Sequence, residues 1–475
     1  MIPLPDSPPE LALALADYLS GELSQTVSVE NLKRLTGGAS RETWAFDASW
    51  AGKSVPLILR RDPPGAPASS DRLVEMAVIR EAGRHGVPVP TVLCGQAGKR
   101  SLGTGFFIME RLDGETVPRK ILRNERFSLA RERLISQCAS ALGSIHQIAP
   151  ASLPELGMVK TAAELVAGLR DLLDALYEPH PVFELALAWL EDNLPEPAPA
   201  CVVHGDFRTG NFLVNEAGLR AVLDWELAHF GDPMEDLGWL CVRSWRFGND
   251  HLPAGGLGTK EQLFAAYERA GGKVDVERVR FYEVYGTLKW GIICVAQAAT
   301  HLRGLVRSVE LAAIGRRACE SEYDLLMLLG GDPLYEAEPV DEGIVPTGQD
   351  RPTIDEALDA VAELLEGSLS TELDARTGFM MRVGARLLRL LQREVIYGST
   401  YGNLDRLELA QLLKIDAADG IPPLQELLVA VSQSLRKRLL CAGEVLGVLS
   451  AITARKLAIA NPSYRIEAGP PSPPS

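Results

Sequence analysis

Short apolar runs alternate with helical periodicity along the first two thirds of the chain. The runs that read as strands are Val55–Leu59, Phe106–Met109 and Ala221–Leu223. Each is followed or preceded by segments in which apolar residues recur three and four positions apart, which is typical of helices. The alternation predicts a mixed unit of strands and helices, of the α/β or α+β class.

Beyond residue 352 the pattern is helical throughout. Thr353-Ile354-Asp355-Glu356 has the sequence of a capping box, and apolar residues follow it at helical spacing. Three further amphipathic helices are predicted over Phe379–Val395, Leu424–Leu440 and Val445–Ala460. We therefore predict an all-helical domain over residues 353–466.

A seam separates the two parts. Gly330-Gly331-Asp332-Pro333 opens an acidic, proline-containing run that ends at Arg351-Pro352, so residues 331–352 are predicted to be a linker. The chain ends in a proline- and serine-rich stretch, and residues 467–475 are predicted to be a disordered tail.

Composition narrows the class of protein. With 475 residues, 46% hydrophobic and 23% charged, the chain has the profile of a soluble protein with two or three domains. The formal net charge of −15 argues against a nucleic-acid or anionic-membrane surface. We interpret the compact basic cluster Arg436-Lys437-Arg438 as a solvated helix turn.

The cysteines indicate a reducing compartment, and the apolar stretches are too short to cross a membrane. Seven cysteines without a C-x-x-C pair indicate neither a disulfide framework nor a zinc site. The N-terminus carries Asp6 and Glu10 in place of a basic leader, and the most apolar stretch, Trp290–Thr300, is far shorter than the roughly 20 residues of a membrane helix. We expect a cytoplasmic protein that does not enter a membrane.

Residues 203–226 carry the chemistry. His204-Gly205-Asp206 begins a D-x-x-x-x-N spacing that ends at Asn211, and Asp224 follows a second apolar run. Two carboxylates and an amide at this spacing are the set that a magnesium-dependent phosphoryl transfer requires. Asp206 would orient or deprotonate an acceptor hydroxyl, Asn211 would bind a metal ion, and Asp224 would bridge a metal ion to the nucleotide phosphates.

The segment resembles the Brenner-type motif of the aminoglycoside phosphotransferase superfamily, which includes choline, homoserine-type and fructosamine kinases. An arginine directly after the phenylalanine of the motif, here Arg208, resembles the pattern of one branch of this superfamily. Members of that branch are fused to, or encoded beside, acyl-CoA dehydrogenases. Gly231-Asp232-Pro233 and Asp236-Leu237-Gly238-Trp239 match the same branch. The end of the helical domain, from Lys456 to Tyr464, resembles a bacterial helical family of unknown function.

The resemblance implies an α+β, bilobal, protein-kinase-like fold that binds ATP between its lobes. A small β-rich lobe would span residues 1–110, and a larger helical lobe with the catalytic and acceptor sites would span residues 111–330. ATP and Mg²⁺ are the implied cofactors.

The resemblance also implies a nucleotide site in the smaller lobe. The Gly-Gly-x-Ser-x-x-Thr hairpin would cover the phosphates with Gly37, Gly38 and Ser40, although adjacent glycines are also common in ordinary hairpin turns. Arg60 stands where most members carry a phosphate-holding lysine, and its alternative role is that of a surface arginine at a strand end. Glu75 would be the carboxylate partner, with Glu81 as the substitute. An inter-lobe hinge at Met109, Glu110 and Arg111 would offer main-chain groups to adenine.

Several nearby residues have more than one interpretation. Arg208 would contact the acceptor or the transferred phosphoryl group, or would pair with Asp232 or Asp236. His204 and Asp236 are interpreted as residues that hold the loop in place, and His146 as a packing residue.

The acceptor is a small molecule whose identity the motif leaves open. The stretch from residue 239 to 325 is aromatic and contains Arg303, Arg307, Arg316 and Arg317, which suits a hydroxyacyl-CoA or a hydroxy acid better than a polycationic aminoglycoside. The alternatives are an aminoglycoside kinase and a nucleotide-binding pseudokinase that acts through its helical domain. That domain is the candidate surface for a protein partner or for self-association.

Overall fold

A computed structural model of the chain describes residues 7–35, 42–62, 72–98, 101–332, 337, 354–367, 375–416 and 420–464. The contacts divide the chain into two compact units, and each unit is formed by two separate segments. Unit 1 comprises Met1–Thr161 and Glu196–Glu283, and unit 2 comprises Ala162–Pro195 and Val284–Ser475.

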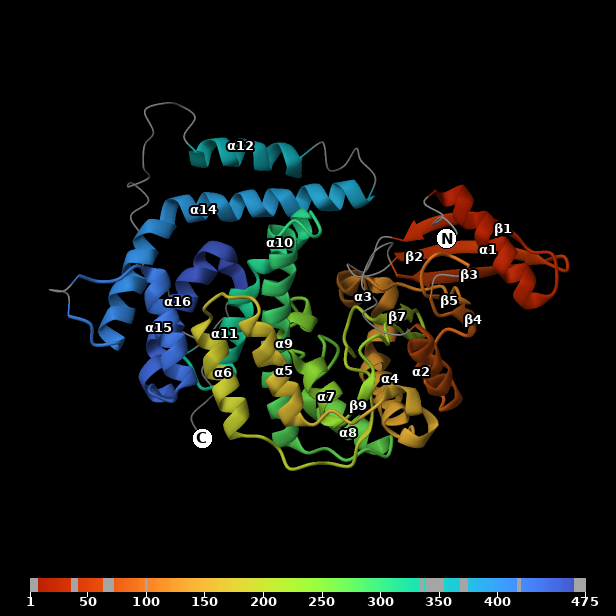
Figure 1. Cartoon of the computed structure of the whole chain (residues 1–475), viewed down its shortest axis with the longest axis horizontal. Coiled ribbons are helices and arrows are strands. Elements are labelled where there is room, and N and C mark those ends of the chain that lie inside the picture. Colours follow the sequence, from red (N-terminus) through yellow and green to blue (C-terminus); the bar gives the residue numbers. More distant parts are fainter. Residues whose placement is uncertain are drawn as a thin grey trace. The chain divides into compact units, whose positions relative to one another are not determined.

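Unit 1 begins with an antiparallel sheet in the order β1-β2-β3-β5-β4 (Figure 1). Its strands are β1 (Ser28–Leu35), β2 (Glu42–Trp50), β3 (Lys53–Arg61), β4 (Val92–Gln96) and β5 (Phe106–Glu110). The strand-like runs at 55–59 and 106–109 lie within β3 and β5, so both predicted strands are confirmed.

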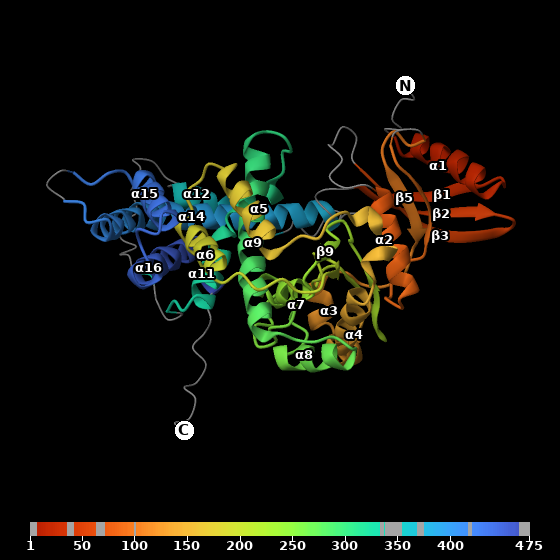
Figure 2. The same ribbon diagram turned by 60° about the horizontal axis from the view of Figure 1, so that its bottom comes forward.

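One face of this sheet is covered by helix α1 (Pro8–Leu23), as Figure 2 shows. Leu11, Leu15 and Leu19 of α1 pack with alternate residues of the strands, which are Phe46, Leu57, Leu59, Phe106 and Ile108. Because side chains alternate between the faces of a strand, Arg60 leaves β3 on the opposite face from Leu59.

The rest of unit 1 is mainly helical, with two short ladders. Its helices are α2 (Arg72–Arg84), α3 (Pro118–Arg123), α4 (Ser128–His146), α7 (Met234–Cys241), α8 (Lys260–Arg269) and the first turns of α9 (Val276–Leu302). The ladders pair β6 (Cys201–Val203) with β9 (His229–Gly231), and β7 (Phe212–Asn215) with β8 (Gly218–Val222). The predicted run at 221–223 therefore ends β8.

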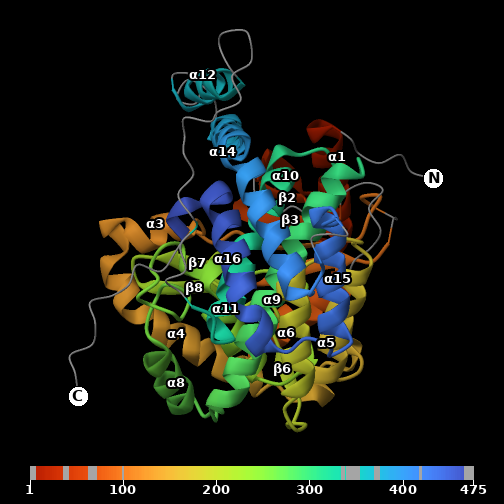
Figure 3. The ribbon, with the colours of Figure 1, turned by 90° about the vertical axis from the view of Figure 1, so that its left-hand side faces the viewer.

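In the described part of unit 2, the regular secondary structure is helical throughout (Figure 3). They are α5 (Ala162–Asp174), α6 (Pro181–Asp192), the remainder of α9, α10 (Val309–Gly315), α11 (Ala318–Leu328), α12 (Ile354–Glu366), α14 (Ala375–Leu412), α15 (Leu424–Arg436) and α16 (Ala442–Ala460). The α+β fold class and the helical C-terminal region are confirmed. Thr353 of the predicted capping box lies outside the described residues.

The helix predicted over Phe379–Val395 is longer than expected. It continues through Gly398 and Gly402 to Leu412. Tyr397 and Tyr401 stack at 5.7 Å beside these glycines, and Asp405 pairs with the buried Arg455 of α16 at 2.6 Å. Tertiary contacts therefore hold a segment in which glycine propensity alone predicts an end.

The contact-based units do not follow the predicted sequence boundaries. Helices α5, α6, α10 and α11 precede the seam at residue 331, yet they group with the helices that follow it. The boundaries at 110, 330 and 353 stay a prediction about sequence modules.

The structure describes the cysteines and the apolar helices that the composition brought into question. All seven cysteines are free thiols; six are buried and Cys441 is exposed. Among the described residues, none of the helices combines the length and the apolarity needed to cross a membrane.

Gly238 is placed where α7 meets α9, and its lack of a side chain permits the contact. A Cβ at this position would lie 2.6 Å from the backbone carbon of Tyr282. We expect Gly238→Ala to destabilise the protein by about 1–3 kcal/mol, because the backbone of a packed helix must shift. Thermal unfolding measures the change. Gly21→Ala in α1, where a Cβ meets nothing within 4 Å, is the matched control and should not lower the melting temperature.

Candidate active site

Two loops at the ends of the short ladders form the site. The first runs from β6 to β7 and contains residues 204–211, and the second runs from β8 to β9 and begins at Leu223. The Leu223 amide donates to the Asn211 carbonyl at 2.8 Å, and Leu223 O lies 3.2 Å from His204 Nε2. The ladder geometry thus brings Asp206, Asn211 and Asp224 together from separate stretches of sequence.

His204 joins the two loops as a neutral imidazole. Its Nδ1 accepts from the Asp206 amide at 3.2 Å, so Nε2 carries the proton and donates to Leu223 O. Burial lowers the pKa of His204 below its ordinary value, against the opposing charges of Asp236 and Asp206. The ring is therefore a structural connection and does not act as a charged group near pH 7.

Asp236 of α7 holds the start of the first loop in place. Its carboxylate accepts from the amides of His204 and Gly205 at 2.8 and 2.9 Å, and from His146 Nε2 at 3.2 Å. Burial would raise the pKa of Asp236, but the hydrogen bond and charge of His146, together with the His204 interactions, outweigh burial and hold the pKa below its usual range. At Gly205 φ is +78°, and a Cβ would lie 2.5 Å from Leu227 O, which explains the glycine of the motif.

Three donors fix the carboxylate of Asp206. Arg208 Nε and Trp239 Nε1 each donate to its Oδ1 at 2.9 Å, and Asn211 Nδ2 donates to its Oδ2. Sequence reasoning assigned Trp239 to an aromatic stretch near the acceptor and missed this hydrogen bond. The signal that could have found it is its place three residues after Asp236 on the same helix.

Arg208 lies between Asp206 and an aromatic ring. Its guanidinium carbon is 4.4 Å from the centre of the Trp245 ring, within the range of a cation–π contact. The alternative partners have other cations or donors: Asp232 accepts from Arg278 at 2.7 Å, and Asp236 holds the loop as described. Arg208 therefore belongs to the Asp206 group.

Asn211 and Asp224 offer oxygen atoms that suit a divalent ion. Asn211 Nδ2 faces two acceptors, the main-chain and side-chain oxygens of Asp206, so its Oδ1 must point to the other side. Asp224 has φ of +68°, an unusual conformation for a residue other than glycine, and its carboxylate contacts Arg60 at 2.8 Å. One carboxylate and one amide oxygen, completed by phosphate oxygens, form a donor set that Mg²⁺ accepts. Among the described residues, no group of three or more His, Cys, Asp and Glu side chains could hold a metal ion by itself.

Arg60 connects the sheet to these loops. Its Nη2 lies 2.8 Å from Asp224 Oδ1 and its Nη1 lies 3.4 Å from Glu75 Oε1. Burial acts to lower the pKa of Arg60, but the charges of Asp224 and Glu75 raise it further above its ordinary value. The guanidinium therefore stays charged although its side chain is only 12% exposed.

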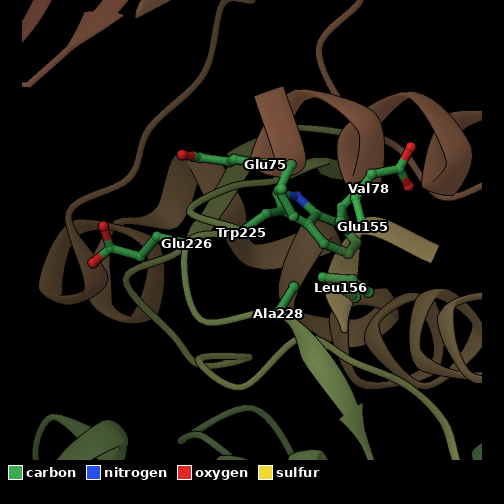
Figure 4. A pocket seen from close by; sticks show the side chains of 8 residues that line it. Glu75, Val78, Glu155, Leu156, Trp225, Glu226 and Ala228 are labelled. Carbon is green, nitrogen blue, oxygen red and sulfur yellow. The ribbon is translucent and has the colours of Figure 1, made fainter. Parts of the chain in front are cut away.

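Glu75, and not its substitute Glu81, lies beside Arg60. Glu75 also pairs with Arg72 of the same helix, whereas Glu81 pairs with Arg84 at 2.7 Å. A cavity of about 290 Å³ adjoins this helix and the loop after Asp224. In Figure 4 the Trp225 ring lies centrally in its lining, and the carboxylates of Glu75 and Glu226 point away from that ring.

The proposed hinge residues make their hydrogen bonds within the sheet. The Glu110 amide donates to Thr91 O at 2.9 Å and the Arg111 amide to Pro56 O at 3.1 Å, while Arg111 pairs with Asp47. Met109 is buried in β5. Because these two amides already have acceptors in the protein, they are not available to donate to adenine. Gly37, Gly38 and Ser40 lie outside the described residues.

The arginines of residues 303–317 have structural partners in unit 2. Arg303 donates to Ala175 O, Arg316 pairs with Glu394 at 2.6 Å, and Arg317 pairs with Glu320 at 2.9 Å. The aromatic residues Trp239, Trp245, Phe281, Tyr282 and Tyr285 are buried. Most of this stretch is therefore core, and Arg208 is the cation that lies beside Asp206.

Comparison with known proteins agrees with the geometry. Residues 31–282 match the phosphotransferase enzyme family, and residues 371–464 match a domain of unknown function, DUF6285. The chain is 27% identical over 333 residues to "Probable acyl-CoA dehydrogenase IBR3" of Arabidopsis thaliana, covering 62% of this chain and 39% of that protein. It is 26% identical over 321 residues to acyl-CoA dehydrogenase family member 10 of Mus musculus, covering 64% of this chain and 30% of that protein.

A solved structure shares the fold. The "putative aminoglycoside phosphotransferase" of Ralstonia eutropha superposes with a TM-score of 0.53 at 21% identity, covering 65% of this chain and 95% of that structure. The resemblance to the aminoglycoside phosphotransferase superfamily, to its acyl-CoA-dehydrogenase-associated branch and to a helical family of unknown function is confirmed. The chain spans well under half of the curated relatives named above.

The anchoring role of Asp236 can be measured without knowledge of a substrate. Asp236→Ala leaves two buried amides without their acceptor, so we expect a loss of roughly 3 kcal/mol in the free energy of unfolding. Urea unfolding provides the measurement. The matched control is Glu216→Ala, which removes an ion pair with Arg126 in which both side chains are more than half exposed and should leave the free energy of unfolding nearly unchanged. Equal effects of the two substitutions would contradict the anchoring role.

Proposed function

Because the chain belongs to the phosphotransferase enzyme family, we propose that it transfers the γ-phosphoryl group of ATP to a hydroxyl group of a small molecule, with the help of Mg²⁺. The observation that carries the proposal is the joint placement of Asp206, Asn211 and Asp224 at the ends of two linked loops. Three donors, one of them Asn211 itself, hold the Asp206 carboxylate in a single orientation.

Each residue has a distinct role in this proposal. Asp206 accepts the hydrogen of the acceptor hydroxyl while that oxygen attacks the γ-phosphorus and the bond to the β-phosphate oxygen breaks. Asn211 Oδ1 and Asp224 hold Mg²⁺, which neutralises charge on the phosphates when it is bound. The proton of the hydroxyl passes to the Asp206 carboxylate, and ADP leaves.

Arg60 takes the place of the phosphate-holding lysine in this proposal. Its planar fork reaches Glu75 with one nitrogen and Asp224 with the other, a geometry that a lysine ammonium on a single stem does not reproduce. The Arg60 guanidinium thus places a positive charge beside Asp224 and links the loop that carries Asp224 to α2. The arrangement supports a variant nucleotide site.

The acceptor we propose is a hydroxyacyl-CoA or a related hydroxy acid. Arg208 places a cation beside Asp206, and a cation there favours an anionic group on the acceptor over the ammonium groups of an aminoglycoside. The relatives named above carry acyl-CoA dehydrogenase in their names, which supports an acyl-bearing substrate. Arg208, not the arginines of residues 303–317, is the residue on which this preference rests.

Asp206→Ala tests the catalytic residue. We expect phosphoryl transfer to fall by about 100-fold or more, because positioned acid–base groups contribute factors of roughly 10² to 10⁴. ATP affinity, followed by fluorescence titration or calorimetry, should stay within about threefold, because Asp206 acts on the acceptor. Glu216→Ala is the control for a carboxylate outside the site. An active Asp206→Ala protein would remove Asp206 from the mechanism.

A panel of acceptors tests the substrate class. The unaltered protein and Asp224→Ala are incubated with ATP, with and without Mg²⁺, and with hydroxyacyl-CoAs, hydroxy acids, amino alcohols or aminoglycosides. We expect magnesium-dependent transfer to the hydroxyacyl-CoAs or hydroxy acids and its loss in Asp224→Ala. Transfer to aminoglycosides alone would overturn the proposed acceptor, and ATP binding without transfer to any compound would favour the pseudokinase.

A further inference from the structure

Helix α11 carries three buried carboxylates. Every residue from Ala318 to Leu326 is buried, including Glu320, Glu322 and Asp324, which are 5%, 1% and 6% exposed. A buried carboxylate is costly unless cations or hydrogen-bond donors surround it. Because residues two positions apart point to different sides of a helix, these carboxylates need partners on more than one side of α11.

The end of the chain supplies those partners. Lys456 Nζ lies 2.9 and 2.6 Å from the two oxygens of Glu322, Asn461 donates to Glu320 at 2.9 Å, and Tyr464 donates to Asp324 at 2.8 Å. Between these polar contacts, Leu457 packs with Cys319 and Tyr323 in a small apolar cluster. Figure 3 shows α16 beside α11.

A second set of ion pairs joins acids of α5 and α6 to arginines at the end of α15. Arg436 pairs with Asp174 and Glu184, and Arg438 lies 3.0 and 3.1 Å from Glu191 and Asp192. Arg436, Lys437 and Arg438 are exposed at the end of α15, as the interpretation of a solvated helix turn expects. The two arginines also pair with acids about 250 positions earlier in the chain, which the sequence does not show. In both sets the acids precede residue 331 and the bases follow residue 354.

We propose that residues 354–464 form a docking module, in which Lys456, Leu457, Asn461 and Tyr464 recognise the acidic helix α11 and Arg436 and Arg438 recognise α5 and α6. All six of these residues lie within residues 371–464, which match the domain of unknown function. The proposal concerns non-covalent association and does not depend on the chemistry of the active site.

Lys456 and Glu322 form the central contact of this interface. Burial alone would raise the pKa of Glu322, but Lys456 and His180 lower it to about 2, so the carboxylate stays ionised at neutral pH. His180 Nδ1 approaches Glu322 at 3.1 Å from the residue just before α6. Removing Lys456 leaves a buried carboxylate with His180 as its main partner, which is far less favourable than the intact group.

The test cuts the full chain and asks whether its parts stay together. A site for a specific protease is inserted between residues 348 and 349, outside the described residues, and the cut protein is analysed by gel filtration and by binding measurements on the separated fragments. We expect the unaltered fragments to elute together. Lys456→Met should raise their dissociation constant by at least about tenfold, a factor that corresponds to about 1.4 kcal/mol.

The control is Lys437→Met, which removes an exposed lysine from the same module and should leave the dissociation constant unchanged. Tyr464→Phe removes a single hydroxyl from the interface, so its effect does not depend on whether Lys456→Met folds, and we expect a rise of about threefold or more. Circular dichroism shows whether each fragment keeps its helices. Separate elution of folded, unaltered fragments would overturn the proposal, as would equal affinities for Lys437→Met, Lys456→Met and Tyr464→Phe.

Discussion

The buried carboxylate of Asp236 is the contact on which the catalytic loop depends. It accepts two consecutive main-chain amides, those of His204 and Gly205, and so sets the path of the chain immediately before Asp206. His146 donates to the same carboxylate from α4, and Tyr267 lies 2.7 Å from the other nitrogen of that imidazole. A relay of polar groups from three helices therefore orients a loop that has no regular structure of its own.

A second constraint acts on the opposite side of the site. Asp224 adopts a left-handed backbone conformation that non-glycine residues avoid, and Arg60 holds its carboxylate from the sheet. The strain is tolerated because Leu223 is tied to both Asn211 and His204. Asp206, Asn211 and Asp224 are thus parts of one hydrogen-bonded unit, and displacement of either loop disturbs all three.

Features that depend on residues close together in the chain could be predicted from the sequence. The short apolar runs predict β3 and β5, and the motif groups Asp206, Asn211 and Asp224, which lie on two linked loops. The donor from Trp239 to Asp206 was missed because an indole in an apolar helix reads as core. The extension of α14 past Gly398 was missed because the support of that segment comes from α16. Both failures concern contacts between residues far apart in the chain, which periodicity does not report.

Net charge gives an incomplete picture of what this protein can bind. The formal charge of −15 describes an acidic chain, yet Glu320, Glu322 and Asp324 are buried and matched to groups from the C-terminal helices. Acids of this kind set which segments of the chain associate, and they add little to the field that an approaching ligand experiences. Near Asp206 the partly exposed charges are those of Asp206 and Arg208, which pair at 2.9 Å beside Trp245. Charges of opposite sign that pair this closely largely cancel at a distance, and screening in salt water limits the influence of more distant charges to about 10 Å. The net charge of the chain therefore does not decide which ligand binds near Asp206.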